Sequence, residues 1–207
     1  TSSVQEVMDL AGVAHIVALK ARVPFLHFFD GFRTSHEIQK VEIIDDASLT
    51  SLLDRDALKA FRAAALNPAH PVTRGTAQNP DIYFQTREAA NRFYDVLPDM
   101  VAETMEEISK ITGRTYKPFT YYGAEDAENI VIAMGSVTET VKECVDYLLS
   151  QGEKVGVITV HLYRPFSAKY LFNVLPASVK RICVLDRTKE PDASGEPLFL
   201  DIRDAFY

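Results

Sequence analysis

Short apolar runs alternate with amphipathic helical patterns from residue 129 to the end of this 207-residue chain. The connections between them are only a few residues long. Strands and helices that alternate with short connections imply right-handed crossovers and a parallel sheet wrapped by helices. The sequence therefore predicts an α/β fold for this part of the chain. Strands are expected at 129–134, 154–160 and 181–185, and helices at 137–150, 168–175 and 197–205.

The chain opens with a helix signal that leads into an apolar run. Ser3 and Glu6 form a capping box, and apolar residues recur behind them at helical spacing, which predicts a helix from about residue 4 to 21. Residues 23–29 are apolar at successive positions and rich in aromatics, the pattern of a strand covered on both faces in a parallel sheet. A loop signal at 30–31 ends this run.

The middle of the chain is expected to be helical and then irregular. One or two amphipathic helices are predicted within 46–66. Residues 67–81 hold three prolines and several polar side chains, so an ordered but irregular connection is expected there, and it is a candidate domain boundary. A further helix is predicted at 98–112, because Pro98 suits its first position and Gly113 follows its end.

Composition and charge narrow the classes of function. The chain is 47% hydrophobic and 25% charged, as in soluble globular proteins. Its net charge of −7 and the absence of a long basic stretch make nucleic acid an unexpected partner. The longest apolar run is far shorter than the roughly 20 residues of a membrane span, so a cytoplasmic protein is expected. Cys144 and Cys183 lie in apolar segments and are expected to be buried, with no disulfide framework and no metal-ligand spacing.

The loop after the apolar run carries the main candidate site. It combines a fixed cation, two hydroxyls, an imidazole and a carboxylate just past the carboxyl end of the expected strand, where ligands bind in open α/β sheets. Such a set can hold a carboxylate-bearing substrate and handle protons. The residues are Arg33, Thr34, Ser35, His36 and Glu37. A structural alternative stays open, in which Arg33 pairs with Glu37 and Thr34 or Ser35 only caps a helix.

Two further positions lie at the carboxyl ends of predicted strands. The turn Gly135-Ser136 opens a helix for which Ser136 and Glu139 form a capping box. Backbone N–H groups at such a helix start favour an anion, but a lone Gly-Ser is a weak signal, and a purely structural turn is expected here. Arg187 and Lys189 follow the last strand and could bind a phosphate or the acidic surface of another domain. The mixed charges of that loop favour domain docking. The five histidines share no metal-ligand spacing, so no metal site is predicted.

Several unbroken blocks along the whole chain resemble pyruvate:ferredoxin (flavodoxin) oxidoreductase. In order they are residues 1–11, FFDGFRTSHEIQK at 28–40, RGTAQNPD at 74–81, LYRPF at 162–166 and VLDRTKEP at 184–191. Blocks that keep their order are far more specific than a short motif. Because the chain begins with Thr1 rather than Met, it is expected to be an internal piece of this longer enzyme.

The resemblance implies the activity of the complete enzyme. That family decarboxylates pyruvate on thiamine diphosphate, forms acetyl-coenzyme A, and passes electrons through iron–sulfur clusters to ferredoxin or flavodoxin, usually as a homodimer. Residues 1–46 would then end the pyrimidine-binding domain of the thiamine fold, 47–115 would connect, and 116–207 would form a domain II like the transketolase C-terminal domain. The magnesium and cluster ligands are expected outside this piece, so no cofactor site is complete in it and the isolated piece is expected to be inactive.

The resemblance also favours an active-site role for residues 30–37, by analogy with the histidine-bearing loop of transketolase-type enzymes. His36 and Arg33 are then the expected catalytic residues, and Thr34 and Ser35 the expected substrate-binding ones. Arg187 and Lys189 are expected to dock other domains. Two alternatives remain, a non-catalytic docking or coenzyme A-binding α/β module and a stand-alone regulatory domain.

Overall fold

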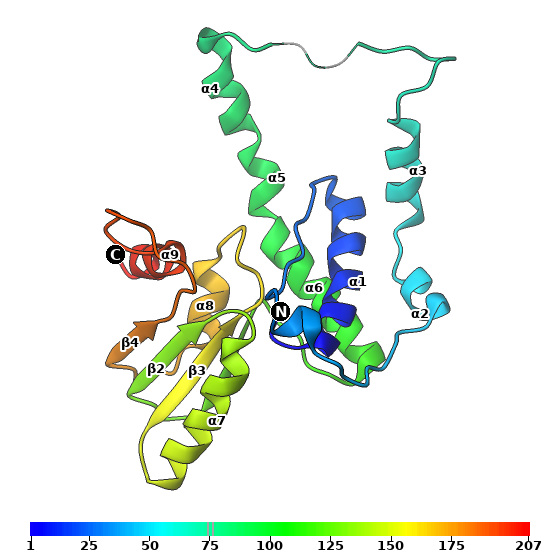
Figure 1. The fold of residues 1–207 in the computed structure, drawn as a ribbon. Coiled ribbons are helices and arrows are strands. Elements are labelled where there is room, and N and C mark those ends of the chain that lie inside the picture. Colours follow the sequence, from blue (N-terminus) through cyan, green and yellow to red (C-terminus); the bar gives the residue numbers. More distant parts are fainter. Residues whose placement is uncertain (74, 76) are drawn as a thin grey trace.

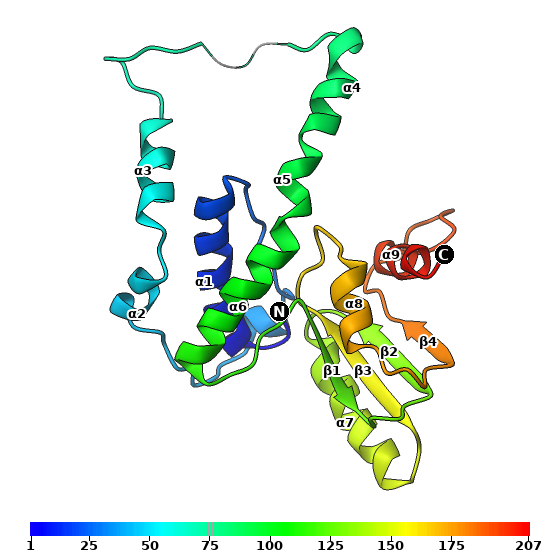
Figure 2. The same ribbon diagram turned by 180° about the vertical axis from the view of Figure 1, so that it is seen from behind.

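The computed structural model describes residues 1–73, 75 and 77–207, which form two packed parts and a projecting arm (Figures 1 and 2). Within the described residues, no helix has both the length and the apolar character of a membrane span. The elements are α1 (Val4–Ala21), the 3₁₀ helix η1 (Thr34–His36), α2 (Asp46–Ser51), α3 (Arg55–Ala63), α4 (Pro80–Ala89), α5 (Asn91–Asp95), α6 (Leu97–Thr112), β1 (Phe119–Gly123), β2 (Asn129–Ala133), α7 (Val137–Ser150), β3 (Val155–Val160), α8 (Ala168–Val174), β4 (Arg181–Val184) and α9 (Pro197–Ala205).

Helix α1 starts at the capping residue that the sequence predicts. The Ser3 hydroxyl accepts the Glu6 N–H at 3.2 Å, and the Glu6 carboxylate turns back to accept the Ser2 N–H at 2.6 Å. The apolar stripe of α1 packs against α6, which ends as expected at Gly113 with φ 71°. The buried residues of this first core are Leu10, Val13, Val17, Leu97, Val101, Met105, Ile108, Tyr116 and Leu162.

A buried carboxylate ties α1 to the chain that follows α6. Asp9 is fully buried and accepts hydrogen bonds from Arg114 Nε at 2.7 Å and from the Tyr116 hydroxyl at 2.6 Å. Arg114 also donates to Glu42, whose side chain is 79% exposed. Because a buried carboxylate needs charged or hydrogen-bonding partners, this network fixes the path of the chain from α6 toward the sheet.

The segment 23–29 is extended, but it is not a strand, so the prediction of a buried strand is wrong for this structure. Val23 and Phe25 pack against the first core, whereas Leu26 is 85% exposed and Phe28 is also exposed. The described residues place no strand beside this segment, so its backbone has no sheet partner and one of its two apolar sides lies open.

The arm consists of α3, α4, α5 and the described residues of the connection between α3 and α4 (Figures 1 and 2). The helices expected within 46–66 are present as α2 and α3. Helices α4 and α5 were not predicted, because their apolar residues stand next to one another instead of three or four positions apart. In the irregular connection expected at 67–81, residues 74 and 76 lie outside the described residues.

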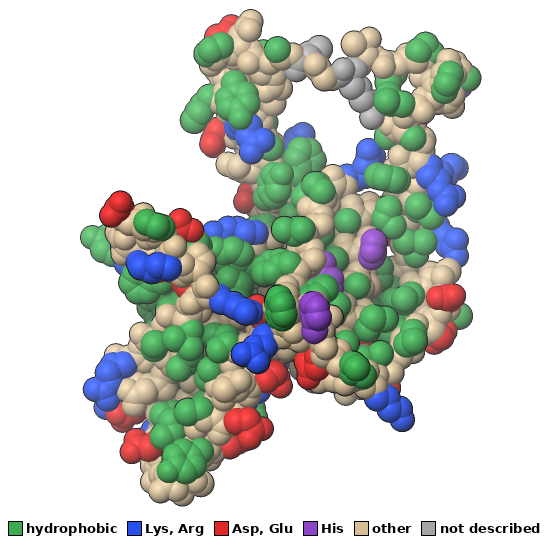
Figure 3. Space-filling view, in the orientation of Figure 1, with side chains coloured by type: hydrophobic (Ala, Val, Ile, Leu, Met, Phe, Trp, Pro, Cys, Tyr) green, Lys and Arg blue, Asp and Glu red, His purple; other side chains and the backbone are tan. Residues whose placement is uncertain are grey.

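Helices α2 to α5 contain no buried residue. Apolar side chains gather at the end of the arm that is uppermost in Figure 3. The large exposed apolar side chains from α3 to the start of α6 are Phe61, Leu66, Val72, Ile82, Tyr83, Phe84, Phe93, Tyr94 and Val96.

The second part is a four-stranded sheet with the order β1-β3-β2-β4. Strands β2, β3 and β4 are parallel, as predicted, and β1 pairs antiparallel with β3. The sheet is therefore mixed instead of wholly parallel, and β1 escaped prediction because an edge strand lacks the continuous apolar run of a buried one. Helix α7 covers one face, and α8 and α9 cover the other (Figures 1 and 2). The core on the α8 and α9 side includes Phe119, Ile130, Ile132, Ile158, Val160, Leu171, Leu198 and Ile202.

Cys144 and Cys183 are exposed free thiols, so the prediction that they are buried is wrong. Both line one shallow groove between α7 and β4. Helix α7 packs against β1, β2 and β3, and the face of β4 beside it stays open. The apolar pattern around each cysteine predicted the helix and the strand correctly, but it did not tell which face is covered.

The buried network predicts a large effect for Asp9→Ala. This variant should lower the free energy of unfolding by about 3 kcal/mol, because it leaves Arg114 and the Tyr116 hydroxyl without their buried acceptor. Glu42→Ala is the matched control, since it removes the exposed partner of the same Arg114 and should cost less than about 1 kcal/mol. Urea denaturation followed by circular dichroism measures both. Equal losses of unfolding free energy in the two variants would contradict the claim that the buried Asp9 contributes more to stability than the exposed Glu42.

Candidate functional site

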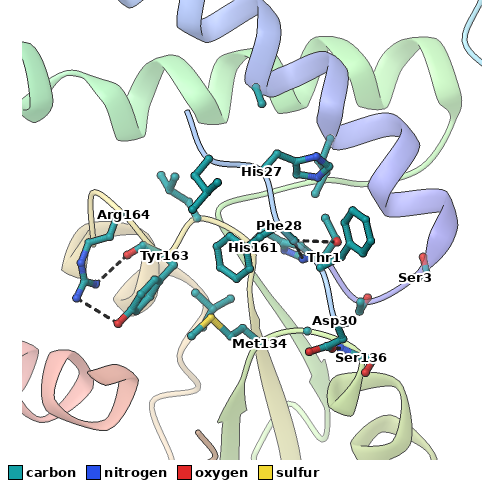
Figure 4. Close-up of a pocket in the computed structure, with 18 of the residues that line it drawn as sticks. Thr1, Ser3, His27, Phe28, Asp30, Met134, Ser136, His161, Tyr163 and Arg164 are labelled. Atoms are coloured by element: carbon teal, nitrogen blue, oxygen red, sulfur yellow. Dashed lines mark hydrogen bonds between the residues drawn. The ribbon is translucent and has the colours of Figure 1, made fainter. Parts of the chain in front are cut away.

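A large cleft separates the first part from the carboxyl edge of the sheet (Figure 4). Its volume is about 1990 Å³, which exceeds the roughly 300 to 1,000 Å³ of a typical small-molecule pocket. One wall is the chain from Val23 to Glu37, and the other is formed by the residues that follow β2, β3 and β4. The cleft thus lies where ligands bind in open α/β sheets. Figure 3 shows histidine and Lys or Arg side chains at this seam.

The predicted loop is held in one conformation by its own hydrogen bonds. Within the loop, the single 3₁₀ turn η1 forms. The Ser35 hydroxyl accepts the Phe32 N–H at 2.9 Å and lies 2.7 Å from His36 Nδ1. The rings of Phe32 and His36 are stacked, with centroids 5.0 Å apart. Phe32 has φ 68°, a conformation that bulky residues rarely adopt, so these contacts hold a strained backbone and fix the imidazole.

Arg33 and His36 both line the cleft and are both exposed. The guanidinium of Arg33 has no hydrogen-bond or ion-pair partner among the described residues. Glu37 instead accepts a 2.6 Å hydrogen bond from Gln39, so the surface pair between Arg33 and Glu37 is not formed. The structure therefore leaves the charge of Arg33 available to a ligand in the cleft.

The two predicted substrate-binding hydroxyls lie in different surroundings. Thr34 is buried, and its Oγ1 has no hydrogen-bond partner within the described part of the chain. It is not among the residues that line the cleft. The Ser35 hydroxyl is engaged by Phe32 and His36. In this geometry Ser35 orients the imidazole.

Asp30, at the start of the loop, reaches across the cleft to the sheet. Asp30 and Ser136 lie together in Figure 4, and the Asp30 carboxylate accepts the Ser136 N–H at 2.5 Å. The same carboxylate also accepts a hydrogen bond from Arg187 Nη1. Burial raises the pKa of Asp30, but the Ser136 N–H and the Arg187 guanidinium more than offset this and lower it below its usual value. The helix start at Gly135-Ser136, which could in principle receive an anion, is thus filled by the chain's own carboxylate. The predicted capping box is absent, because Ser136 makes no side-chain cap.

The two cations after β4 have different partners. Arg187 belongs to the junction with Asp30, which comes from the first part. The Lys189 Nζ lies 3.0 Å from Glu196 Oε1, which belongs to the same sheet part, and the Lys189 side chain is 81% exposed. A docking role for Arg187 and Lys189 toward further domains stays a prediction.

A second junction joins the start of α1 to the end of β3. His161 Nε2 lies 3.2 Å from Glu6 Oε1, and the His161 side chain is only 4% exposed. His161 Nδ1 and His27 Nε2 are buried without a partner in the described structure, and both residues line the cleft. The sequence patterns assigned neither of these two histidines a functional role. The position of His161 directly after a strand end was the signal that could have marked it.

Tyr163 and Arg164, which also follow β3, pair with each other on the cleft wall (Figure 4). The Arg164 guanidinium lies over the Tyr163 ring, 4.0 Å from its centroid, and donates to the Tyr163 hydroxyl at 3.2 Å. It also donates to Asp201 at 2.7 Å. Arg164 is therefore already paired, in contrast to Arg33.

The described residues do not form a diphosphate and metal site by themselves. No group of three or more His, Cys, Asp or Glu side chains among them is placed to hold a metal ion. The helix start that could receive a phosphate is blocked by Asp30. The described residues of the cleft therefore show no ligand set for such a group.

Two family models match the chain. One is described as pyruvate flavodoxin/ferredoxin oxidoreductase, thiamine diphosphate-binding, and covers residues 1–106. The other is described as pyruvate:ferredoxin oxidoreductase core domain II, and covers residues 127–207. The two matches fall on the helical part with its arm and on the sheet part, in agreement with a thiamine-fold region followed by a transketolase-C-like domain.

Curated relatives are similar over the whole chain. The pyruvate-flavodoxin oxidoreductase of Enterobacter agglomerans is 65% identical over 206 residues, which is 100% of this chain and 18% of that protein. The pyruvate:ferredoxin oxidoreductase of Moorella thermoacetica is 61% identical over 203 residues, 98% of this chain and 17% of that protein. The chain thus spans less than a fifth of these relatives.

A solved structure is similar at a lower level. It is the 2-oxoglutarate:ferredoxin oxidoreductase from Magnetococcus marinus with 2-oxoglutarate, coenzyme A and succinyl-CoA bound, at 21% identity and a TM-score of 0.35 over 56% of this chain and 18% of that chain. A likeness at this level supports no inference about fold or ligand.

The junction of Glu6 with His161 predicts a specific acid sensitivity. Burial raises the pKa of Glu6, but His161 and the Ser2 N–H more than offset this and lower it from 4.5 to about 2. A folded-state pKa below the unfolded one stabilises the protein above pH 4.5, and this stabilisation is lost as the pH falls toward 2. The shift corresponds to about 3 kcal/mol.

Glu6→Gln should therefore be less stable than the wild type at pH 7 and should lose less stability between pH 5 and pH 3. The urea midpoint, measured at both pH values for both proteins, gives the difference. Parallel pH dependences would contradict this role of Glu6.

Proposed function

The chain belongs to the pyruvate flavodoxin/ferredoxin oxidoreductase family, and from this premise we propose that it forms one wall of the pyruvate site in a longer oxidoreductase. The complete enzyme would convert pyruvate and coenzyme A to acetyl-coenzyme A and carbon dioxide, and would pass an electron pair to ferredoxin or flavodoxin. The similarity of whole-chain relatives that are pyruvate-flavodoxin and pyruvate:ferredoxin oxidoreductases supports this activity.

The observation that carries the proposal is that one loop presents an unpaired guanidinium and a fixed imidazole to the same cleft. Arg33 has no partner among the described residues, and His36 is fixed by Ser35 and Phe32 at the edge of the same cleft. A guanidinium binds a carboxylate such as that of pyruvate in a charge-assisted pair. An imidazole can donate a hydrogen bond to an oxygen on which negative charge develops, or move a proton. We assign substrate binding to Arg33 and charge stabilisation to His36.

The proposal assigns the remaining machinery to other parts of the longer protein. Thiamine diphosphate, magnesium and the iron–sulfur clusters would be held there, since the residues that the structure describes do not form their sites. Coenzyme A, the electron acceptor and a second subunit of a homodimer would also be bound there, and the enzyme would be cytoplasmic. On this view the isolated chain is inactive.

Arg187 bears on the alternative of a coenzyme A-binding module, because its contact with Asp30 favours docking over phosphate binding.

Variants of the complete oxidoreductase test the proposal. His36→Ala should lower kcat/KM for pyruvate about a hundredfold, the usual effect of removing one donor to a developing charge. Arg33→Ala should act mainly through a higher KM. Lys40→Ala is the matched control, because Lys40 carries the same charge on the same exposed segment but does not line the cleft. Steady-state kinetics at several pyruvate concentrations separates the two effects. Wild-type kinetics in both loop variants would return the loop to a structural role.

A further inference from the structure

We infer that the sheet part of this chain sets the position of residues 30–37, and that Asp30 is the positioning residue through which it does so. The inference rests on the proposed function of Arg33 and His36. It assigns the sheet part, which matches core domain II of the family, a role in positioning a loop of the first part. Asp30 itself needs no contact with substrate.

The side chain and the backbone carbonyl of Asp30 bind different partners. Its side chain binds the Ser136 N–H and Arg187, both beyond the carboxyl ends of strands in the sheet. Its backbone carbonyl accepts the Ser35 N–H at 3.2 Å and so closes the loop. One residue therefore holds the sheet and the loop at once, five positions before the hydroxyl that orients His36.

The sheet side of the junction is built to receive a carboxylate. Ser136 lies at the start of α7, where unpaired N–H groups and the helix dipole favour negative charge, and Arg187 adds a cation. Gly135 stands at φ 82°, and a Cβ there would lie 2.7 Å from Asp30 Oδ2. The absence of a side chain at this position is what lets the carboxylate approach the helix.

The consequence is a mechanical link from the sheet to the cleft. If Arg187 and Ser136 hold Asp30, a shift of the sheet part moves the start of the loop, and with it Arg33 and His36. A contact that only joined two surfaces would contribute to stability without changing the order of the loop or the kinetics.

The test uses the complete oxidoreductase with Arg187→Ala and Asp30→Asn. Both variants should still fold, because Arg187 is exposed and the side-chain carbonyl of Asn can still accept the Ser136 N–H. Lys189→Ala is the matched control, since it removes a neighbouring cation that binds Glu196 instead. Amide hydrogen exchange of residues 31–37 and the kinetics with pyruvate are measured for each.

Loss of a hydrogen bond to a charged group predicts exchange about tenfold faster in residues 31–37 of Arg187→Ala, and a fall in kcat/KM of similar size. Lys189→Ala should match the wild type in both. Unchanged exchange in Arg187→Ala and Asp30→Asn would overturn the inference. Faster exchange with unchanged kinetics, in an enzyme that His36→Ala impairs, would also overturn it. If His36→Ala and Arg33→Ala are both unimpaired, the proposed function fails, and exchange alone decides whether the sheet positions the loop.

Discussion

The carboxylate of Asp30 holds the helical part of the chain against the edge of the sheet. It accepts the Ser136 N–H and pairs with Arg187, and Glu6 makes a second junction with His161 nearby. Both carboxylates come from the first part, and their partners follow strand ends in the second. Charge-assisted hydrogen bonds are directional, so these contacts fix orientation as well as adding stability. The cleft and its loop depend on that orientation.

Helix α1 anchors both strands of the antiparallel pair beside the cleft. Asp9 binds Tyr116, which leads into β1, and Glu6 binds His161, which leaves β3. Residues three apart lie on the same side of a helix, so one side of α1 reaches the two chain segments together. Phe119 and Val160 pair at that end of the sheet, and the His161 N–H donates to the Pro118 carbonyl at 2.9 Å. Polar contacts near the start of α1 thus fix these two chain segments, while Asp99 of α6 binds Lys169 and Tyr170 of α8 and Leu162 packs into the first core.

Hydrophobic periodicity predicted the elements whose burial follows from their own amphipathic pattern. It failed where burial or strand pairing depends on segments far away in the sequence. Helix α1, α6 and the alternation from β2 to α9 follow from the pattern of apolar residues. The segment 23–29 has the composition of a buried strand, but strand pairing needs a neighbour that local sequence does not specify. The loop was found through its chemistry, and Arg33 and His36 do line one cleft. The role of Asp30 could not be predicted, because its partners Ser136 and Arg187 are more than a hundred positions away.

The distance between α1 and α7 tests most directly whether the two parts are held in one orientation. Spin labels can be placed at the exposed Cys144 on α7 and at His15→Cys on the exposed side of α1, with Cys183→Ser to leave one native thiol. Double electron–electron resonance on this protein should give a single narrow distance distribution, which broadens when Glu6→Gln and Asp30→Asn are combined. A broad distribution with the two carboxylates intact would contradict the account.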